Sequence, residues 1–392
     1  MAITRRAFIR IGGWSLAEIP LLASLGCSRS SSAPTGSPAA VPWKQRVAGI
    51  EKQVRASMAA RRVPGVSIAL IRDAQIAWTG HFGVRSRDTN VPVDEATVFS
   101  AQSMSKPVFA YRVMKLAEQG VLDLDAPLTR YTPDVFVKDD PRLQEITARR
   151  VLSHTTGLPN WRSPDDPLRI NFQPGSKWSY SGEGYHYLQT VVSELTGHID
   201  TAVCGAFEMG YRVCATDFGE YMDSKLLRPF GMTSSGYAFT PAMRRVLAAP
   251  HDANGRLLPN DPPTVPAIAR YGSAGALMTT AHDYARFLIE VMDPKPADDY
   301  RLSDASRIEM LKPQITAGET PIKASWALGW QIWHLDKGKV VAHGGDFDGR
   351  HSQSAFSPER KSGFVILTNG DGGLPLIWTD LLKPLVEDVV LA

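Results

Sequence analysis

A chain of 392 residues with 43% hydrophobic and 21% charged residues has the composition of a folded globular protein, and it is long enough for one large two-part domain or two ordinary ones. The net charge of +3 falls to +1 without residues 1–27, which leaves 40 basic against 39 acidic residues. A charge this balanced, with no basic arm, argues against nucleic acid as a partner. No run of 18 or more uncharged apolar residues occurs, so we expect no membrane-spanning helix.

The N-terminus predicts export. Paired arginines in "TRRAFIR", followed by a weakly apolar stretch that Gly and Pro interrupt, are typical of a twin-arginine signal over residues 1–27. The sequence "LLASLGC" resembles a lipobox with Cys27 as the lipidated residue, and plain cleavage nearby is the alternative. Residues 28–42 predict a flexible tether. We therefore expect a periplasmic protein or one anchored to the membrane through a lipid on Cys27.

A helix and a hairpin open the predicted fold. Apolar residues recur at helical spacing over residues 43–61, which predicts an amphipathic helix. In "GVSIALIRDAQIAWTGHFG", two strand-like runs flank a polar turn at Arg72-Asp73 and predict a hairpin. The next helix has Pro107 in its first turn, where a missing N–H costs nothing, and ends at Gly120.

The rest of the chain predicts a helical insertion followed by strands. Residues 126–265 are rich in Pro, Gly and short helical segments, which indicates a mostly helical lobe. Thr280 is expected to cap a helix, with Asp283 three residues later. The last strands and the final helix are predicted at residues 327–335, 339–345, 352–358, 362–369 and 374–390.

These elements predict an α+β fold of the mixed α/β class. One antiparallel sheet would be built from both chain ends and flanked by helices, with the helical lobe inserted between its two parts. The domain of residues 43–392 would then have an α/β part, residues 43–125 and 266–392, and a lobe, residues 126–265.

Several common catalytic motifs are absent from the sequence. There is no G-x-S-x-G, Walker A loop, G-x-G-x-x-G or H-E-x-x-H, which removes the simplest readings as an α/β-hydrolase, nucleotide-binding protein or zinc protease. Its cysteines are too few, and too far from a suitable histidine pair, to indicate a metal site. We expect no cofactor and no metal.

One Ser-x-x-Lys sequence, Ser103 to Lys106, is a candidate nucleophile and base. A serine hydroxyl attacks only when a base takes its proton, and a lysine one helical turn away can do so if burial lowers its pKa. At a helix N-terminus the amide of Ser103 would also favour a developing negative charge. The alternative is a helix cap beside a solvated lysine.

Two further segments carry candidate residues. Tyr180 lies on a Gly- and Ser-rich turn before a helix, where it can relay a proton if Lys106 lowers its pKa; a packed aromatic is the alternative. His343-Gly344-Gly345 ends a strand, where the glycines permit close approach of a substrate. His343 can bind a carboxylate or carbonyl or set the local charge, or it is incidental to a turn.

Taken in order, these segments resemble the serine β-lactamase-like superfamily, which includes class C β-lactamases, D-alanyl-D-alanine carboxypeptidases and family VIII carboxylesterases. The resemblance covers about residues 43–392. It depends on the following motifs, in this order: "FSAQSMSK", "LAEQGVLDLDAPLTRY", "RRVLSHTTGLP", "FQPGSKWSYSGEGY", "SAGALMTTAHDYARFL", "ALGWQIW" and "HGGDFDGRHSQSAFSP".

The resemblance implies a β-lactamase/transpeptidase-like fold and acyl transfer through an acyl-enzyme. Ser103 would be the nucleophile, Lys106 its base and Tyr180 the second proton-transfer residue. The backbone N–H groups of Ser103 and Asp346 would form the oxyanion hole. The implied substrate-binding residues are Gly182, His343, Gly344 and Gly345.

Two departures from the family pattern weaken the interpretation as a β-lactamase and leave ester or amide hydrolysis. Tyr-x-Asn becomes Tyr180-Ser181-Gly182, which removes an amide, and the lysine of Lys-Thr-Gly becomes His343, which removes a permanent charge. We therefore predict a carboxylesterase acting on small acyl esters. A β-lactamase, a D-amino-acid peptidase or DD-carboxypeptidase, and a non-catalytic protein that binds peptidoglycan fragments are the alternatives.

A segment of about twenty residues, His198 to Asp217, looks inserted relative to the family and carries both Cys204 and Cys214. In an oxidising compartment these two cysteines can form a disulfide; two buried thiols are the other reading.

Overall fold

This computed structural model describes residues 41–132, 136–162, 166–198, 215–237, 240–259, 271–319 and 322–392. The predicted signal, Cys27, Cys204 and Cys214 lie outside the described residues, so the predictions about them stay predictions. Among the described residues, no helix is long and apolar enough to cross a membrane.

An eight-stranded antiparallel sheet forms the centre of the molecule, in the order β2-β1-β10-β9-β8-β7-β6-β5. Strand β1 from the N-terminal part pairs with β10 from the C-terminal part, Val66 opposite Thr368. The prediction of one antiparallel sheet built from both chain ends is therefore confirmed. The strands of this sheet are β1 Gly65–Arg72, β2 Gln75–Gly83, β5 Ile315–Gly318, β6 Ala324–Trp326, β7 Gln331–Leu335, β8 Gly338–Phe347, β9 Arg350–Ser357 and β10 Ser362–Thr368.

The central strands are buried on both faces. In β10, Phe364 and Ile366 join a hydrophobic cluster on one face, whereas Val365 and Leu367 join a second cluster on the other. Since successive side chains of a strand point to opposite faces, a continuous apolar run is what a sheet covered on both sides requires.

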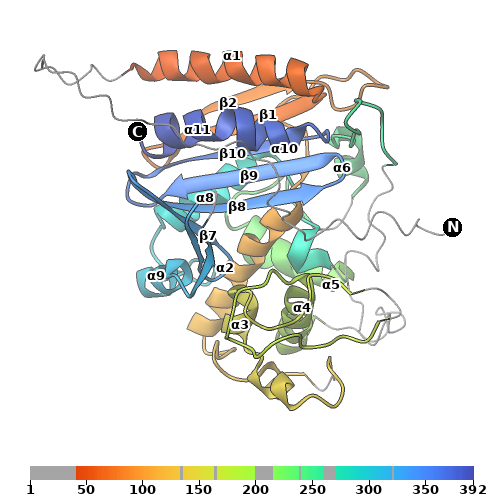
Figure 1. Ribbon diagram of the computed structural model, residues 1–392, viewed down its shortest axis with the longest axis vertical. Coiled ribbons are helices and arrows are strands. Elements are labelled where there is room, and N and C mark those ends of the chain that lie inside the picture. The colour runs from red at the N-terminus through yellow and green to blue at the C-terminus, as the bar shows by residue number, and fades with distance from the viewer. Residues whose placement is uncertain are drawn as a thin grey trace, which may run out of the picture.

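Different parts of the chain cover the two faces. The first helix, α1 (Trp43–Arg61), packs with the C-terminal helices over one face, and its bounds match the prediction. On the other face, α8 (Ala281–Met292) contacts β1 and β10, and α2 (Ser105–Glu118) continues the core away from the sheet. Figure 1 shows α3, α4 and α5 gathered beyond α2, on the opposite side of the sheet from α1.

The described part of residues 126–265 contains helices and turns, with β-structure limited to isolated bridges. One hydrophobic cluster runs from the sheet through Phe109 on α2 to Tyr185 on α4, so this region shares its core with the sheet. The division into two parts at residues 125 and 266 stays a prediction. The helical elements here are η2 Leu128–Arg130, η3 Pro141–Glu145, α3 Ala148–Leu152, α4 Gly182–Thr196, α5 Ala215–Met222, η4 Asp223–Leu227 and α6 Pro241–Val246.

The predicted cap of α8 is confirmed in part. The Thr280 side chain accepts a hydrogen bond from the Asp283 amide at 3.0 Å, as an N-cap residue should. The Asp283 carboxylate, however, accepts from the Ser234 amide and the Ser235 hydroxyl. It therefore joins α8 to a distant segment of the chain.

Two predicted elements differ in detail. The strand expected over 327–335 begins only at Gln331, as β7, because residues 327–330 form the turn between β6 and β7. In this turn Gly329 has a positive φ of 85° and the Ala327 amide donates to the Trp330 carbonyl. The final helix starts at Gly373 and changes helix type after Pro375, Leu381 and Leu385. Its parts are α10 Gly373–Pro375, the π-helical η5 Leu376–Leu381, α11 Leu382–Leu385 and the π-helical η6 Val386–Val390. The sequence did not predict β5, β6 or the small sheet of β3 (Phe99–Ser100) and β4 (Met278–Thr279).

Candidate active site

Ser103 is the middle residue of a short 3₁₀ helix, η1 (Gln102–Met104), which continues directly into α2. The residue just before it, Gln102, has a positive φ of 50°, a left-handed conformation that costs a non-glycine residue about 1–3 kcal/mol. Such strain persists only where the surroundings hold the backbone in place. It is found here at the residue beside the candidate nucleophile.

Neighbouring elements supply that support. The segment around Ser103 is held by hydrogen bonds from the sheet, from α8 and from the segment before β4. The Ser352 hydroxyl donates to the Ala101 carbonyl at 2.9 Å, the Tyr284 hydroxyl donates to the Met104 carbonyl at 2.9 Å, and the Ala101 amide donates to the Leu277 carbonyl at 2.8 Å.

Lys106 is buried, with 1% of its surface exposed. Its Nζ lies 3.3 Å from the Ser103 hydroxyl oxygen and 2.7 Å from the Ala274 carbonyl oxygen. It takes part in none of the ion pairs found among the described residues. Burial without a carboxylate penalises the charged form and lowers the pKa of Lys106 to about 7. A substantial fraction of this amine is therefore neutral near pH 7 and able to accept a proton from Ser103.

Tyr180 lies directly against this pair. The Nζ of Lys106 is 4.7 Å from the centroid of the Tyr180 ring. Burial raises the pKa of Tyr180, and the nearby Ser103 hydroxyl opposes this shift only in part. The condition that Lys106 lowers the pKa of Tyr180 is therefore not met, because burial raises this pKa and the opposing effect comes from Ser103. The Tyr180 hydroxyl interacts with the Ser103 hydroxyl without a well-formed hydrogen bond, so a neutral phenol can bond to a group that reacts at Ser103.

His154 holds Tyr180 from both sides along the chain. Its carbonyl accepts from the Ser179 amide at 2.8 Å, and its Nδ1 accepts from the Ser181 amide at 3.0 Å. The imidazole lies 4.2 Å from the Tyr180 ring, centroid to centroid. Since Nδ1 accepts a hydrogen bond, the ring is neutral with its proton on Nε2, which agrees with the strong lowering of its pKa by burial and by Lys106.

His154 itself has a positive φ of 55°, a second left-handed residue beside the candidate site. The sequence motif "RRVLSHTTGLP" contains it, but nothing in the sequence gave it a role. His154 and Tyr180 lie 26 residues apart in the sequence, and the fold brings them into contact.

His343 is also neutral. Burial, with a smaller effect from Lys106, lowers the pKa of His343 to about 3. Its Nδ1 lies 2.7 Å from the Gly344 carbonyl oxygen, which can only accept, so Nδ1 carries the proton and Nε2 is an acceptor. The neutral ring contradicts the expectation that His343 sets the local charge, whereas its binding of a substrate carboxylate or carbonyl stays a prediction.

The strand that carries His343 packs tightly against η1. A Cβ at Gly345 would lie 2.3 Å from the Ala101 carbonyl oxygen, so only glycine permits this close approach. Asp346 follows on β8, opposite His351 on β9, and its carboxylate pairs with the His351 Nδ1 at 2.6 Å. Burial alone would lower the pKa of His351, but Asp346 and Asp371 outweigh it and raise the pKa. The oxyanion-hole role of the Ser103 and Asp346 amides stays a prediction.

Gly182 begins α4, two residues after Tyr180. Its amide donates to the backbone carbonyl and to the side-chain oxygen of Asn160, both at 3.0 Å. The fold thus brings Ser103, Lys106, Tyr180 and His343 together. Gly182 lies two residues after Tyr180 in the chain.

Comparisons with known proteins agree with this arrangement. The family model described as Beta-lactamase matches residues 50–377, most of the chain. The chain belongs to the Beta-lactamase family. The resemblance of the sequence to the serine β-lactamase-like superfamily is thereby confirmed.

Individual relatives of this family are distant. "Putative beta-lactamase-like 1" of Homo sapiens is 25% identical over 353 residues, which cover 83% of this chain and 65% of the human protein. "Penicillin-binding protein 4" of Amycolatopsis lactamdurans is 25% identical over 367 residues, 88% of this chain and 89% of that protein. The chain thus spans less than two thirds of the human relative's length.

Solved structures confirm the fold. The octameric penicillin-binding protein homologue from Pyrococcus abyssi superimposes with a TM-score of 0.69 at 23% identity, over 87% of this chain and 79% of that one. The D-alanine carboxypeptidase AmpC from Burkholderia cenocepacia gives 0.69 at 18% identity, over 87% and 99%. At such identities the likeness establishes the architecture alone.

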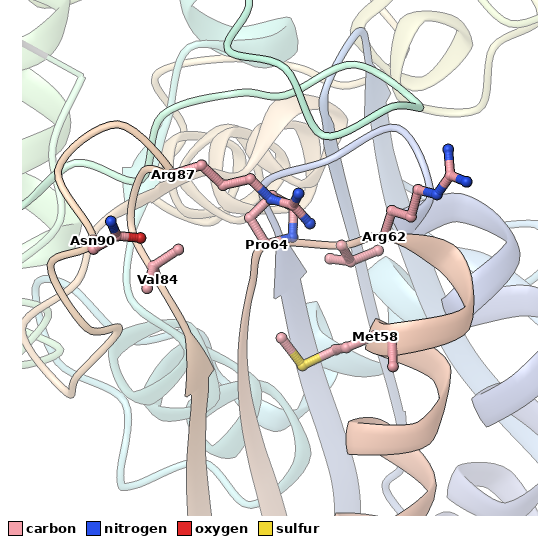
Figure 2. Close-up of a pocket in the computed structure, with 8 residues that line it drawn as sticks. Met58, Arg62, Pro64, Val84, Arg87 and Asn90 are labelled. Atoms are coloured by element: carbon pink, nitrogen blue, oxygen red, sulfur yellow. The ribbon is translucent and has the colours of Figure 1, made fainter.

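A surface pocket of about 490 Å³ lies away from these residues, between the end of α1 and the segments next to β1 and β2. Figure 2 shows Arg62 and Arg87 at its rim, with Met58, Pro64 and Val84 lining it. It contains neither a nucleophile nor a base with a shifted pKa, so it is not where the family's chemistry would occur. No cluster of His, Cys, Asp or Glu suited to a metal ion occurs in the described part of the chain.

Proposed function

We propose that this chain is a carboxylesterase that hydrolyses small acyl esters through an acyl-enzyme on Ser103. The observation that carries the proposal is the buried Lys106, whose Nζ lies 3.3 Å from the Ser103 oxygen with a pKa lowered to about 7. A base with a pKa near the working pH combines a useful neutral fraction with enough basicity to take the proton.

Acylation would begin when neutral Lys106 takes the Ser103 proton and the serine oxygen attacks the ester carbonyl carbon. The carbonyl electron pair moves to its oxygen, and the Ser103 and Asp346 amides would stabilise the oxyanion. Collapse re-forms the carbonyl and breaks the bond to the alcohol oxygen. The leaving alkoxide takes a proton from the Lys106 ammonium, directly or through the Tyr180 hydroxyl, which receives a proton as it gives one.

Deacylation repeats the same steps with water. Lys106 takes a proton from water as the water oxygen attacks the acyl carbon. The bond between the acyl carbon and the Ser103 oxygen then breaks. The serine oxygen recovers its proton from Lys106, so acid product and free enzyme result. Tyr180, with a raised pKa, serves as a neutral hydrogen-bond donor and relay throughout.

Two features support an ester over a β-lactam. His343 is neutral and offers an acceptor nitrogen, which repels a carboxylate in place of attracting it. Gly182 offers no amide side chain. An ester with an uncharged acyl group needs neither contact.

A second candidate is hydrolysis of D-amino-acid peptides. It is supported by the printed names of similar proteins, a penicillin-binding protein and a D-alanine carboxypeptidase. The same Ser103, Lys106 and Tyr180 would serve, since the leaving amine also needs a proton. A non-catalytic protein that binds peptidoglycan fragments in the same place is a third reading.

One experiment separates these functions. Purified protein and its Ser103→Ala variant are incubated with p-nitrophenyl acetate, p-nitrophenyl butyrate, nitrocefin and a D-Ala-D-Ala peptide. We expect Ser103-dependent hydrolysis of both esters that exceeds the turnover of nitrocefin and peptide. Rapid nitrocefin turnover without ester cleavage contradicts the proposal, and peptide cleavage alone supports the second candidate. No turnover and no covalent labelling by a fluorophosphonate supports the binding reading.

We also propose export through the twin-arginine route, on the strength of the N-terminal sequence. The test is fractionation of cells that express the full chain or an Arg5→Lys/Arg6→Lys variant. We expect the variant to stay in the cytoplasm, and labelling with radioactive palmitate distinguishes a lipid on Cys27 from simple cleavage.

A further inference from the structure

An indole ring fills the space beside Gly182. A Cβ built on Gly182 would lie 2.3 Å from Cζ2 of Trp161 and 2.5 Å from its Cε2 and Cη2. These distances are far below any ordinary contact, and the obstacle is the body of a rigid ring. The missing side chain at position 182 is therefore matched by Trp161, which comes from a segment about twenty residues earlier.

The direction of this contact can be derived from the backbone. Ser181, the N-cap of α4, has the extended angles φ −138° and ψ 113°. In extended backbone, residues two apart point to the same side, so a Cβ at 182 would point to the side that Tyr180 faces. Trp161 therefore lies on the side of this segment where Tyr180 meets Ser103 and Lys106.

A second aromatic residue connects Trp161 to the base. The ring of Trp161 meets that of Tyr271 edge to face, with 4.7 Å between centroids. Tyr271 stands three residues before Ala274, whose carbonyl accepts from Lys106 at 2.7 Å. Trp161 and Tyr271 are both partly exposed. The contact between Trp161 and Tyr271 thus joins two parts of the chain. One packs against Gly182, next to Tyr180, and the other contains Ala274, which binds Lys106.

We infer that Trp161 and Tyr271 form an aromatic wall for the acyl group and select esters of flat, apolar acids, such as arylacetic acids, over acetate. This inference rests on the proposed acyl-enzyme. The faces and edges of these rings pack favourably against an aryl group. They offer few hydrogen-bonding groups to an acylamino side chain of a substrate. The same ring that excludes an asparagine at 182 would thereby change the preferred substrate from an acylamino compound to an arylalkanoic ester.

The first test compares kcat/KM for p-nitrophenyl phenylacetate and p-nitrophenyl acetate. We expect the wild-type protein to favour phenylacetate, and Trp161→Ala to lower the phenylacetate-to-acetate ratio by about tenfold, the range for loss of a few apolar contacts. Trp161→Phe should keep most of the ratio. Trp78→Ala is the matched control, since Trp78 is a half-buried tryptophan on β2 that packs on the opposite face of the sheet.

The outcomes are distinguishable. If Trp161→Ala hydrolyses both esters with an unchanged ratio, or if Trp78→Ala changes it as much, the aromatic wall is wrong while the esterase proposal stands. If the wild-type protein hydrolyses no ester and Ser103 takes no fluorophosphonate, the esterase proposal fails and the inference fails with it.

A second test uses the steric coupling directly and needs no ester activity. Gly182→Asn should lower the melting temperature, because its side chain meets the Trp161 ring. The double variant Gly182→Asn/Trp161→Ala should recover much of that loss and react faster with a fluorescent penicillin than Gly182→Asn alone. A Gly182→Asn protein as stable as wild type, or a double variant no better than the single one in both measurements, overturns the inference.

Discussion

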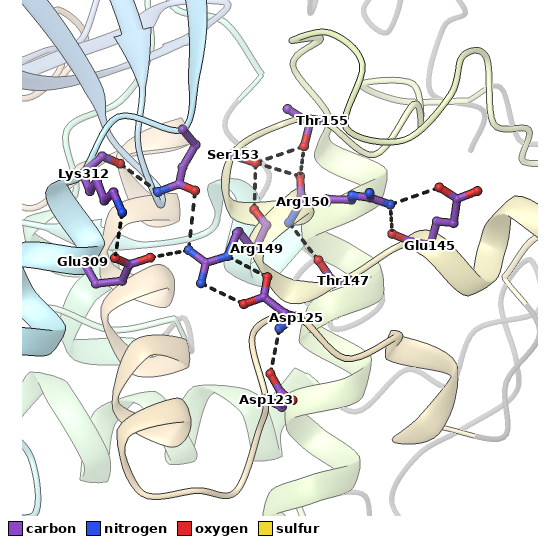
Figure 3. A network of polar contacts seen from close by, with 11 residues as sticks. Asp123, Asp125, Glu145, Thr147, Arg149, Arg150, Ser153, Thr155, Glu309 and Lys312 are labelled. Atoms are coloured by element: carbon purple, nitrogen blue, oxygen red, sulfur yellow. Dashed lines mark hydrogen bonds and ion pairs between the residues drawn. The ribbon is translucent and has the colours of Figure 1, made fainter.

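Lys106 on α2 and Arg149 on α3 are two cations that this fold treats in opposite ways. Arg149, 26% exposed, donates to the Asp125 carboxylate through Nε at 2.7 Å and Nη2 at 2.9 Å, and it also pairs with Glu309 (Figure 3). Lys106 is 1% exposed and bonds only to the Ser103 hydroxyl and the Ala274 carbonyl among the described residues. One charge has two carboxylates, and the other has none.

The consequences for the two pKa values follow from these partners. Hydrogen bonds to Asp125 raise the pKa of Arg149, whereas burial lowers that of Lys106 to about 7. Arg149 joins α3 to α9 (Asp304–Leu311) through its ion pairs, so a retained proton stabilises the fold. A cation that is to take a proton from Ser103 must be able to lose its own, and a nearby carboxylate would prevent that.

The largest expected effect tests whether Ser103 is the nucleophile whose proton Lys106 accepts. Ser103→Ala should lower ester hydrolysis by about three orders of magnitude or more, as removal of a nucleophile does. Hydrolysis is followed with p-nitrophenyl butyrate. Arg149→Lys is the matched control, and it should change the rate far less. If the rate fell equally in Ser103→Ala and Arg149→Lys, the difference between the unpaired Lys106 and the paired Arg149 would have no bearing on catalysis.

Removal of the Lys106 amine should have the next largest effect. Lys106→Met keeps the length of the side chain but cannot accept a proton, so kcat should fall by about 10²–10⁴-fold. In the wild-type protein kcat should rise with pH around 7, because only the neutral amine is a base. A pH–rate profile that stays flat between pH 5 and 9 would exclude Lys106 as the base.

Lys106 also makes stability depend on pH. Its pKa is about 7 in the folded protein and near 10.5 when unfolded, so between these values the unfolded chain binds more protons. The free energy of unfolding should therefore rise with pH from about 7 to 10.5, relative to Lys106→Met. Urea denaturation of both proteins at pH 6 and pH 9 measures this difference. A difference in stability between the two proteins that is the same at pH 6 and pH 9 would contradict it.

The sequence anticipated the local parts of this site better than the assembled parts. Ser103 and Lys106 lie one helical turn apart, so their proximity follows from a predicted helix. The low pKa of Lys106 needs burial, and its carbonyl partner Ala274 lies 168 residues away. No pattern in the sequence joins those two segments.

The same distinction applies to the fold. Apolar periodicity gave the bounds of α1, and the order of strands gave a sheet built from both ends. Periodicity alone did not reveal the turn at Gly329 or the π-helical turns of the last helix, since these depend on how particular backbone groups bond and pack. It also could not show Trp161 against Gly182, because the sequence records only that a side chain is missing there.

Substitution of His154, which contacts Tyr180 near Lys106, should have a smaller effect on catalysis than substitution of Ser103 or Lys106. His154→Ala removes the acceptor for the Ser181 amide and the ring against Tyr180, so kcat should fall by about tenfold while KM changes less, as misplacement of a catalytic group predicts. His154→Asn keeps an acceptor oxygen and tolerates the positive φ, so it should recover part of kcat. A loss confined to KM, or no recovery with Asn, would contradict a positioning role.

The smallest expected effect lies on the Arg149 side. Asp125→Asn removes the partner of Arg149, yet the Asp125 side chain is 63% exposed, so the loss of unfolding free energy should be about 1 kcal/mol or less. The hydrogen bonds from Arg149 lower the pKa of Asp125 below 3.8. The stabilisation is therefore present above pH 3.8 and disappears as the pH falls through the lowered value. Urea denaturation at pH 7 and pH 3 should show a difference between wild type and variant that shrinks in acid, with esterase activity at pH 7 unchanged. A marked loss of activity would mean that this paired cation supports the reaction as well as the fold, and the contrast with Lys106 would then be one of degree.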